Sequence, residues 1–168
     1  RHKYIEQDNK IIRMNDAPYY NQYDGRWSNI SYGLSNFGSR GCAPTVMAMA
    51  FSGIKGYEIY PNYVADYLYY NTQEFNRYTK GTSGLGLIYA KDYYGIKRTG
   101  INTKEQLDEE LKNGKLVFAA MGRGRYGTAF WNHAILLKGY NNGKTYSLDP
   151  LNTNNNIWID TSSVWNES

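Results

Sequence analysis

The distribution of hydrophobic residues along the chain changes near residue 114. Before this point, four stretches are rich in helix-forming residues or carry helix start and stop signals. After it, hydrophobic residues fall in short runs, some alternating with polar residues, and clusters of Gly and Asn separate these runs. Helices followed by strands, without regular alternation of the two, predict an α+β fold rather than a doubly wound parallel sheet.

Four helices are predicted, at residues 42–51, 62–70, 85–94 and from Thr103 to just before Gly114. The first is rich in Ala and Met, and Pro44 falls within its first turn, where backbone N–H groups lack partners in the helix. We expect Gly53 and Gly56 to end this helix. In the fourth, Thr103 and Gln106 have the spacing of a capping box, in which two side chains bond the first backbone N–H groups.

The remaining segments indicate a single domain preceded by an arm. Four short strands are predicted to form a C-terminal antiparallel sheet, at residues 116–121, 133–137, 145–149 and 157–159. Residues 19–39 are rich in Gly, Ser, Asn and Tyr without a regular period, which predicts a long ordered loop of functional importance. Residues 1–17 are polar and irregular, so we expect an N-terminal arm lying on one domain that covers residues 18–168.

Charge and composition exclude several classes of function. The net charge is +4, but the basic residues are scattered without a run of five, so nucleic acid is not an expected partner. No apolar stretch approaches the roughly 18 residues of a membrane-spanning helix. One Cys and two His leave no internal disulfide and make a zinc site hard to assemble, so no metal or cofactor is expected. We expect a monomer.

Tyrosine is abundant, with 18 residues against 5 Phe. Tyr suits half-hydrated surfaces and binding grooves, because one end of the ring is apolar and the other forms hydrogen bonds. An AT-rich genome, which favours Tyr and Asn codons, explains the same composition equally well. The chain opens with Arg1-His2-Lys3 and without the apolar core of a signal peptide, so we expect an excised domain or a mature form.

The one cysteine, Cys42, stands where the first predicted helix begins. A thiol attacks a carbonyl as its thiolate, which the N–H groups at a helix N-terminus and a neighbouring imidazolium both stabilise. The alternative is a buried small hydrophobic residue, since free cysteines are often buried. Gly41 before it and Pro44 after it describe a sharp turn into a helix, which favours the nucleophile.

His133 and Asp149 are candidate partners for such a nucleophile. His133 opens an apolar strand after residues 130–132, and Asp149 ends the next strand, where Pro150 stops the hydrogen-bond ladder. A carboxylate on the neighbouring strand can accept from the imidazole Nδ1–H and leave Nε2 toward the thiol. Alternatively, His133 is a structural imidazole and Asp149-Pro150 an ordinary turn.

The register of the predicted hairpin decides whether His133 and Asp149 can meet. A two-residue loop at 142–143 pairs the strands so that Asp149 lies opposite Leu136, on the wrong face for His133. A three-residue loop or a β-bulge shifts Asp149 opposite Ile135, diagonal to His133 on the same face. A catalytic pair therefore requires the odd-length loop or the bulge.

Gln22 lies in the loop that precedes the predicted nucleophile helix. Its side-chain amide, placed beside the backbone N–H of Cys42, would supply the two donors that stabilise a tetrahedral oxyanion. The alternative is a solvated loop glutamine.

Several segments together resemble a bacterial family of papain-like cysteine peptidases, similar to bacteriocin-processing domains that cleave after double-glycine leaders. The segments are residues 18–27, 32–33, 41–45, 131–133 and 149–150. The resemblance implies a papain-like fold, with Cys42 on an N-terminal helical lobe, His133 and Asp149 on a C-terminal sheet, and Gln22 completing the catalytic set. It also implies a secreted or wall-associated protein. Ala43 stands where the family commonly has glycine, with little expected effect, since alanine can adopt helical angles.

The leading hypothesis is a cysteine peptidase that acts on peptide or protein through a thioester. One alternative is a peptidoglycan amide hydrolase, favoured by the aromatic and mildly basic composition. Another is a binding or adhesion module that has a papain-like scaffold but no catalytic activity. The abundance of tyrosine suggests this alternative. Residues 55–114 resemble nothing specific and are expected to carry the substrate specificity.

Overall fold

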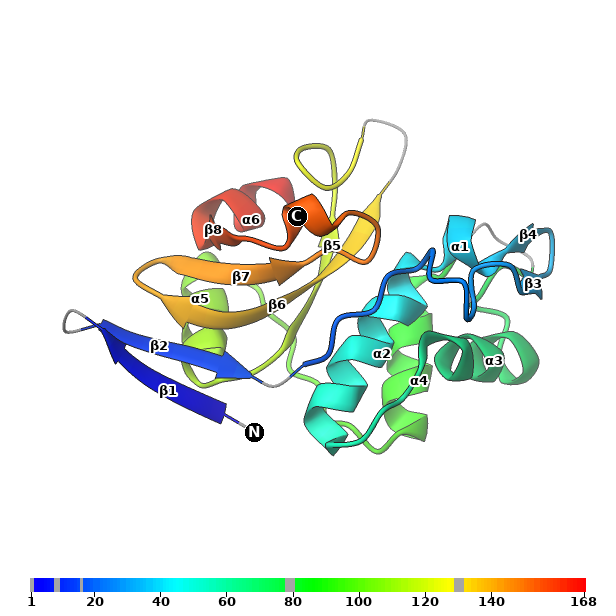
Figure 1. Cartoon of the computed structure of the whole chain (residues 1–168), viewed down its shortest axis with the longest axis horizontal. Helices are drawn as coiled ribbons and strands as arrows, with labels where there is room; N and C mark the ends of the chain where they lie inside the picture. The colour runs from blue at the N-terminus through cyan, green and yellow to red at the C-terminus, as the bar shows by residue number, and fades with distance from the viewer. Residues whose placement is uncertain (1, 8–9, 16, 78–80, 129–131) are drawn as a thin grey trace. The chain divides into compact units, whose positions relative to one another are not determined.

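The computed structural model describes residues 2–7, 10–15, 17–77, 81–128 and 132–168, and these confirm the predicted α+β fold. The described helices are α1 (Phe37–Arg40), α2 (Cys42–Lys55), α3 (Pro61–Asn71), α4 (Gly84–Tyr93), α5 (Lys104–Lys112) and α6 (Thr161–Glu167), with a 3₁₀ turn η1 (Thr153–Asn155). The described strands are β1 (His2–Gln7), β2 (Lys10–Asn15), β3 (Ser31–Tyr32), β4 (Ser35–Asn36), β5 (Val117–Met121), β6 (His133–Asn141), β7 (Lys144–Leu148) and β8 (Trp158–Asp160) (Figure 1).

Contacts divide the chain into two compact units. One, the helical unit, covers residues 18–98, and the other, the sheet unit, comprises residues 1–17 and 99–168. None of the helices in the described part of the chain is long and apolar enough to cross a membrane.

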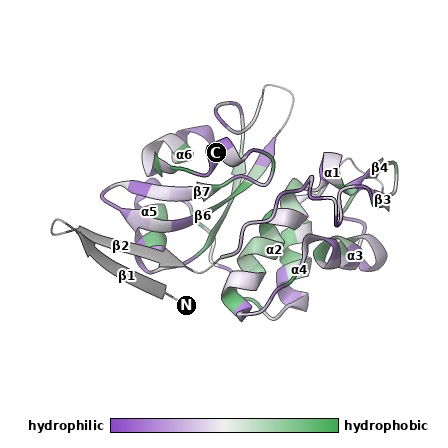
Figure 2. Ribbon diagram, in the orientation of Figure 1, coloured by the Kyte–Doolittle hydropathy of each residue, from purple (hydrophilic) through white to green (hydrophobic). Residues whose placement is uncertain are grey.

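Helix α2 is the centre of the helical unit and contacts both α3 and α4. Figure 2 shows hydrophobic residues along most of its length, and residues 43–53 are all buried. It ends at Gly56, which adopts a left-handed φ of 87° and donates its N–H to the Ser52 carbonyl. Gly53 does not end it, contrary to our expectation. A glycine inside a helix costs only about 1 kcal/mol, which burial of this helix outweighs.

The segment of residues 19–39 is ordered, as predicted, but it contains the short β3–β4 hairpin and α1. Its anchors are aromatic: Trp27 is buried and donates its indole N–H to the Asn21 carbonyl at 2.9 Å. Tyr32 and Phe37 pack with Phe75 in a buried ring cluster. Aromatic packing therefore holds this loop, which has no regular hydrophobic period.

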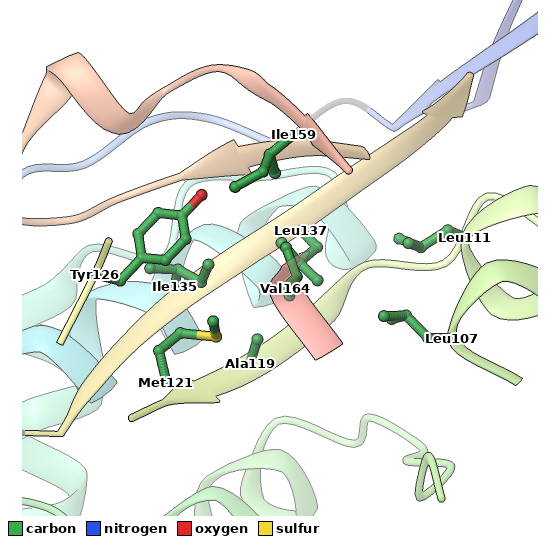
Figure 3. Close-up of a cluster of buried hydrophobic side chains, with 9 residues drawn as sticks. All are labelled: Leu107, Leu111, Ala119, Met121, Tyr126, Ile135, Leu137, Ile159 and Val164. Carbon is green, nitrogen blue, oxygen red and sulfur yellow. The ribbon is translucent and has the colours of Figure 1, made fainter. Parts of the chain in front are cut away.

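The sheet unit is built around β6. Its antiparallel sheet has the order β1-β2-β6-β7-β8, and β5 also pairs with β6. On one face, side chains from α5, α6, the sheet and the turn after β5 form a buried cluster (Figure 3) of Leu107, Leu111, Ala119, Met121, Tyr126, Ile135, Leu137, Ile159 and Val164. The predicted Thr103 cap is present, because its side chain accepts from the Gln106 N–H at 3.1 Å. Gln106 in turn accepts from the N–H of Asn102.

Two elements of this unit differ from the sequence predictions. The N-terminal arm was predicted to be irregular, but its described residues 2–7 and 10–15 form the paired strands β1 and β2, and Arg13 in β2 pairs with Tyr140 in β6. The sequence analysis also missed α6, which packs against α5 and β8. Both elements are short, and pairing or packing with other segments of the chain stabilises them.

The β6–β7 hairpin contains the bulge that a catalytic pair requires. Asn142 and Gly143, with φ of 50° and 83°, form a two-residue loop that pairs Asn141 with Lys144. Farther along, Leu136 pairs with Leu148, so β6 carries one extra residue between Lys138 and Asn141. The two-residue loop and the shifted register thus occur together.

Gly139 lies in this extra segment and has the left-handed φ of 73° that a bulge of this kind uses. The Thr145 hydroxyl donates to the Gly139 carbonyl at 2.8 Å and is fully buried. Beyond the bulge, Leu136 pairs with Leu148, and continuing this register places Asp149 opposite Ile135, diagonal to His133.

Replacing Gly139 by valine tests this bulge. A β-branched residue at a left-handed φ is strained, so we expect Gly139→Val to lower the free energy of unfolding by about 1–2 kcal/mol or more. Urea titration would measure the change. Gly100→Val is the control, since Gly100 is not left-handed and a Cβ there meets nothing within 4 Å. Equal stability of the two variants would contradict a role for Gly139 in the register.

Candidate active site

Cys42 is a partly exposed residue at the start of a helix that is buried over the eleven residues that follow. It is the first residue of α2, and every residue from 43 to 53 is buried. The N–H groups of a helix's first turn lack intrahelical partners and carry partial positive charge. The partly exposed Cys42 thus lies at the end of the helix where these N–H groups gather.

A tight turn places Cys42 at that end. The Gly41 carbonyl accepts hydrogen bonds from the N–H of Thr45 at 3.0 Å and from its hydroxyl at 2.7 Å. A Cβ on Gly41 would lie 2.5 Å from the Phe37 carbonyl oxygen. Only glycine fits this approach of α1 to the start of α2, so Gly41 is a steric requirement of the turn.

Gln22 is ordered and buried, with 4% of its surface exposed. Its Nε2 donates to the Gly38 carbonyl at 2.9 Å, whereas its Oε1 has no hydrogen-bond partner within the described ranges. The amide nitrogen carries two protons, so one N–H remains after the bond to Gly38. Because Gly38 lies four residues before Cys42, this bond ties Gln22 to the turn that leads into α2. A solvated loop glutamine is therefore ruled out.

His133 and Asp149 form a buried pair in the sheet unit. His133 Nε2 and Asp149 Oδ1 are 2.7 Å apart, and the side chains are 8% and 2% exposed. We expected Nδ1 to face the carboxylate, and this is wrong. Diagonal neighbours across strands lie roughly 7–8 Å apart, so the nitrogen at the far end of the ring makes the contact.

The carboxylate of Asp149 is held by several donors besides His133. Its Oδ1 accepts from the backbone N–H groups of Leu151 and Asn152, at 2.8 and 3.3 Å. Its Oδ2 accepts from Asn155 Nδ2 at 2.8 Å. Burial alone would raise the pKa of Asp149, but the hydrogen bonds from His133, Asn155 and Leu151 and the charge of His133 together lower it.

The turn that supplies these donors was missed in the sequence analysis. It contains η1 and four asparagines, Asn152 and Asn154–Asn156, shortly after Asp149-Pro150. Asparagine side chains readily bond nearby backbone groups, so a run of them after a candidate carboxylate is the signal that could have been used.

Some predicted features cannot be placed. Phe130 and Trp131, which precede His133 in the sequence, lie outside the described residues.

Within the described ranges, no group of three or more His, Cys, Asp or Glu side chains could hold a metal ion.

Comparison with protein families identifies the chain's relatives. A family model described as the Peptidase_C39 like family matches residues 14–168, which is nearly the whole sequence. The chain belongs to this family. The family and fold predicted from the sequence are therefore confirmed, and a peptide is the substrate class that the family implies.

A solved structure supports the fold of this Peptidase_C39 like protein. The peptidase domain of Streptococcus ComA, a bi-functional ABC transporter involved in a quorum sensing pathway, aligns with a TM-score of 0.58 and 18% sequence identity. The alignment covers 77% of this chain and 85% of that domain. No curated protein matches the chain.

The lowered pKa of Asp149 predicts how the stability of this family member depends on pH. The unfolded state takes up a proton near pH 3.9 and the folded state only at lower pH, so the stabilisation is complete above about pH 4 and is lost as the pH falls through the folded value. Urea unfolding between about pH 2.5 and 6 should show this loss in wild type and a flatter profile in Asp149→Asn. Asp160→Asn, at an exposed carboxylate of the same unit, should keep the wild-type profile.

Proposed function

We propose that this protein is a cysteine peptidase that hydrolyses peptide or amide bonds through a thioester. Cys42 is the nucleophile, His133 carries the proton, Asp149 orients the imidazole, and Gln22 stabilises the oxyanion. The observation that carries the proposal is the buried 2.7 Å bond between His133 and Asp149 in a chain of the Peptidase_C39 like family.

The burial of the His133–Asp149 pair supports a catalytic role, because removing a carboxylate from water costs free energy. A carboxylate removed from water needs compensating donors, and Asp149 receives them from both the imidazole and the η1 turn. With Nε2 directed to Asp149, Nδ1 is the nitrogen that exchanges protons in the proposed reaction. The carboxylate selects this tautomer and stabilises the imidazolium when it forms.

In the first half of the reaction, the Cys42 thiolate attacks the carbonyl carbon of the scissile bond, and the carbonyl π electrons move onto oxygen. The backbone N–H of Cys42 and the remaining N–H of Gln22 stabilise this oxyanion. The C–N bond then breaks, and His133 gives its proton to the departing amine. The product is a thioester on Cys42.

In the second half, water replaces the amine. Neutral His133 removes a proton from water as its oxygen attacks the thioester carbon. The C–S bond breaks, releasing the carboxylic acid and restoring the thiolate and the imidazolium. The net reaction consumes one water and requires no cofactor.

We further propose that the enzyme acts outside the cell or at the cell wall. The support is the net charge of +4, which attracts a protein weakly to an anionic surface such as a bacterial wall. Peptides of such a wall and unfolded proteins are both amide substrates for this chemistry.

Replacing Cys42 tests the proposed nucleophile. Cys42→Ala and Cys42→Ser should abolish hydrolysis of fluorescent casein and of purified peptidoglycan, because neither side chain supplies a thiolate. The melting temperature should change little, because the residue is small and partly exposed. Residual turnover in Cys42→Ala, or none in wild type on either substrate, would refute the proposal. The relative wild-type rates separate a peptidase from a wall amide hydrolase.

Gln22→Ala and His133→Ala should separate oxyanion stabilisation from thiol activation. Gln22→Ala should lower kcat/KM by roughly 10²-fold and leave alkylation of Cys42 by iodoacetamide unchanged, since alkylation forms no oxyanion. His133→Ala should lower turnover and also slow alkylation of Cys42 at neutral pH, because the imidazole that takes the thiol proton is lost. If Gln22→Ala slows alkylation as strongly as turnover, Gln22 supports the turn before Cys42 and is not an oxyanion donor.

A further inference from the structure

A chain of hydrogen bonds extends behind the His133–Asp149 pair. The Tyr126 hydroxyl donates to Ser147 Oγ at 2.9 Å, and the Ser147 hydroxyl donates to the Asn155 carbonyl at 2.6 Å. Asn155 Nδ2 donates to Asp149 Oδ2 at 2.8 Å, and Asp149 Oδ1 meets His133 Nε2 at 2.7 Å. All five residues belong to the sheet unit. The chain therefore links the segment before β6 to the imidazole through Asn155.

The groups that hold Asn155 are themselves rigid. Ser147 lies in β7, is fully buried, and pairs with Leu137 of β6. Tyr126 is 8% exposed and belongs to the buried cluster on α5, α6 and the sheet. The Asn155 main chain is thus attached to the packed core, and its side-chain amide projects from a defined position toward Asp149.

The two carboxylate oxygens of Asp149 receive different donors. Oδ1 accepts from His133 and from the backbone N–H groups of Leu151 and Asn152. Oδ2 accepts from Asn155. Donors at both oxygens resist rotation of the carboxylate about its Cβ–Cγ bond, and hydrogen bonds to charged groups are stronger than neutral ones. Loss of the Asn155 donor would release that rotation.

The neighbouring asparagines have different partners. The Asn152 side chain accepts from the N–H of Asn154 and caps η1. The Asn156 side chain accepts from the N–H of Asp149 and orders the main chain. Asn154 is exposed. Within this turn, the Asn155 side chain is the one that donates to the carboxylate of Asp149.

We infer that Asn155 is a positioning residue of the proposed peptidase, which holds the carboxylate plane of Asp149 so that Oδ1 faces Nε2 of His133. It acts through Asp149 and does not touch the substrate. The inference rests on the proposed function for its catalytic consequence. Its geometric part, the orientation of the carboxylate, is independent of that function.

The test compares Asn155→Asp with Asn154→Asp. Both change one amide of the same turn to a carboxylate of equal size, but the first removes a donor from Asp149 and places negative charge beside it. NMR of the His133 ring follows the protonation of Asp149, and His2, the other histidine, is an internal reference. We expect the Asp149 midpoint to rise by roughly one pH unit or more in Asn155→Asp and to stay unchanged in Asn154→Asp.

The other titratable groups that interact with Asp149 are the same in both variants. Tyr126 and His133 interact with Asp149, and both are retained in each variant. Asn155→Ala adds no charge and keeps the main-chain bond to Ser147, so it serves if Asn155→Asp folds poorly. It should raise the same midpoint, because the donor is lost.

Kinetics supply the second readout. Asn155→Asp and Asn155→Ala should lower kcat roughly tenfold at neutral pH with little change in KM, because the imidazole and not the substrate is displaced. Asn154→Asp should match wild type. If the Asn155 variants match Asn154→Asp in both the midpoint and kcat, Asn155 is only a turn residue and the inference fails. A wild type without turnover, combined with a raised midpoint in the Asn155 variants, would refute the peptidase and keep the positioning of Asp149.

Discussion

The extra residue of β6 between Lys138 and Asn141 determines which side chains of the sheet unit share a face. Strand side chains alternate between faces, so a shift of one residue moves every later side chain to the opposite side. Without it, the two-residue loop at 142–143 would place Asp149 opposite Leu136. With it, Asp149 lies diagonal to His133, and the buried hydrogen bond between them becomes geometrically available.

That bond imposes a second requirement, because a buried carboxylate is stable only when donors replace its water. The η1 turn meets the requirement with backbone N–H groups and the amide of Asn155. Although burial raises the pKa of Asp149, the hydrogen bonds from His133, Asn155 and Leu151 together lower it, so the carboxyl is ionised at neutral pH. An anionic Asp149 accepts from His133 and sets the ring orientation, so the polar turn after β7 and the imidazole on β6 depend on one another.

The helical unit meets a different constraint: a largely buried helix has to begin at a partly exposed cysteine. Residues 43–53 are buried, whereas Cys42 at the first position is partly exposed. Gly41 and Gly38 allow backbone and aromatic groups to approach closely around this turn, and Gln22 bonds to the Gly38 carbonyl. The position of Cys42 thus follows from steric requirements of neighbouring glycines as much as from the helix itself.

The sequence by itself determined the elements with local signals: α5 from the Thr103 cap, strands β5 to β8 from runs bounded by Gly and Asn, and the helix that begins at Cys42. These signals act over a few residues, so they can be read directly. Tertiary structure decided the β6–β7 register, the pairing of Asp149 with Nε2 rather than Nδ1 of His133, and the pairing of β2 with β6. It also decided that the Asn155 side chain bonds to Asp149. Each of these features depends on contacts between residues that are separated in the chain, and no local sequence pattern records the energies of such contacts.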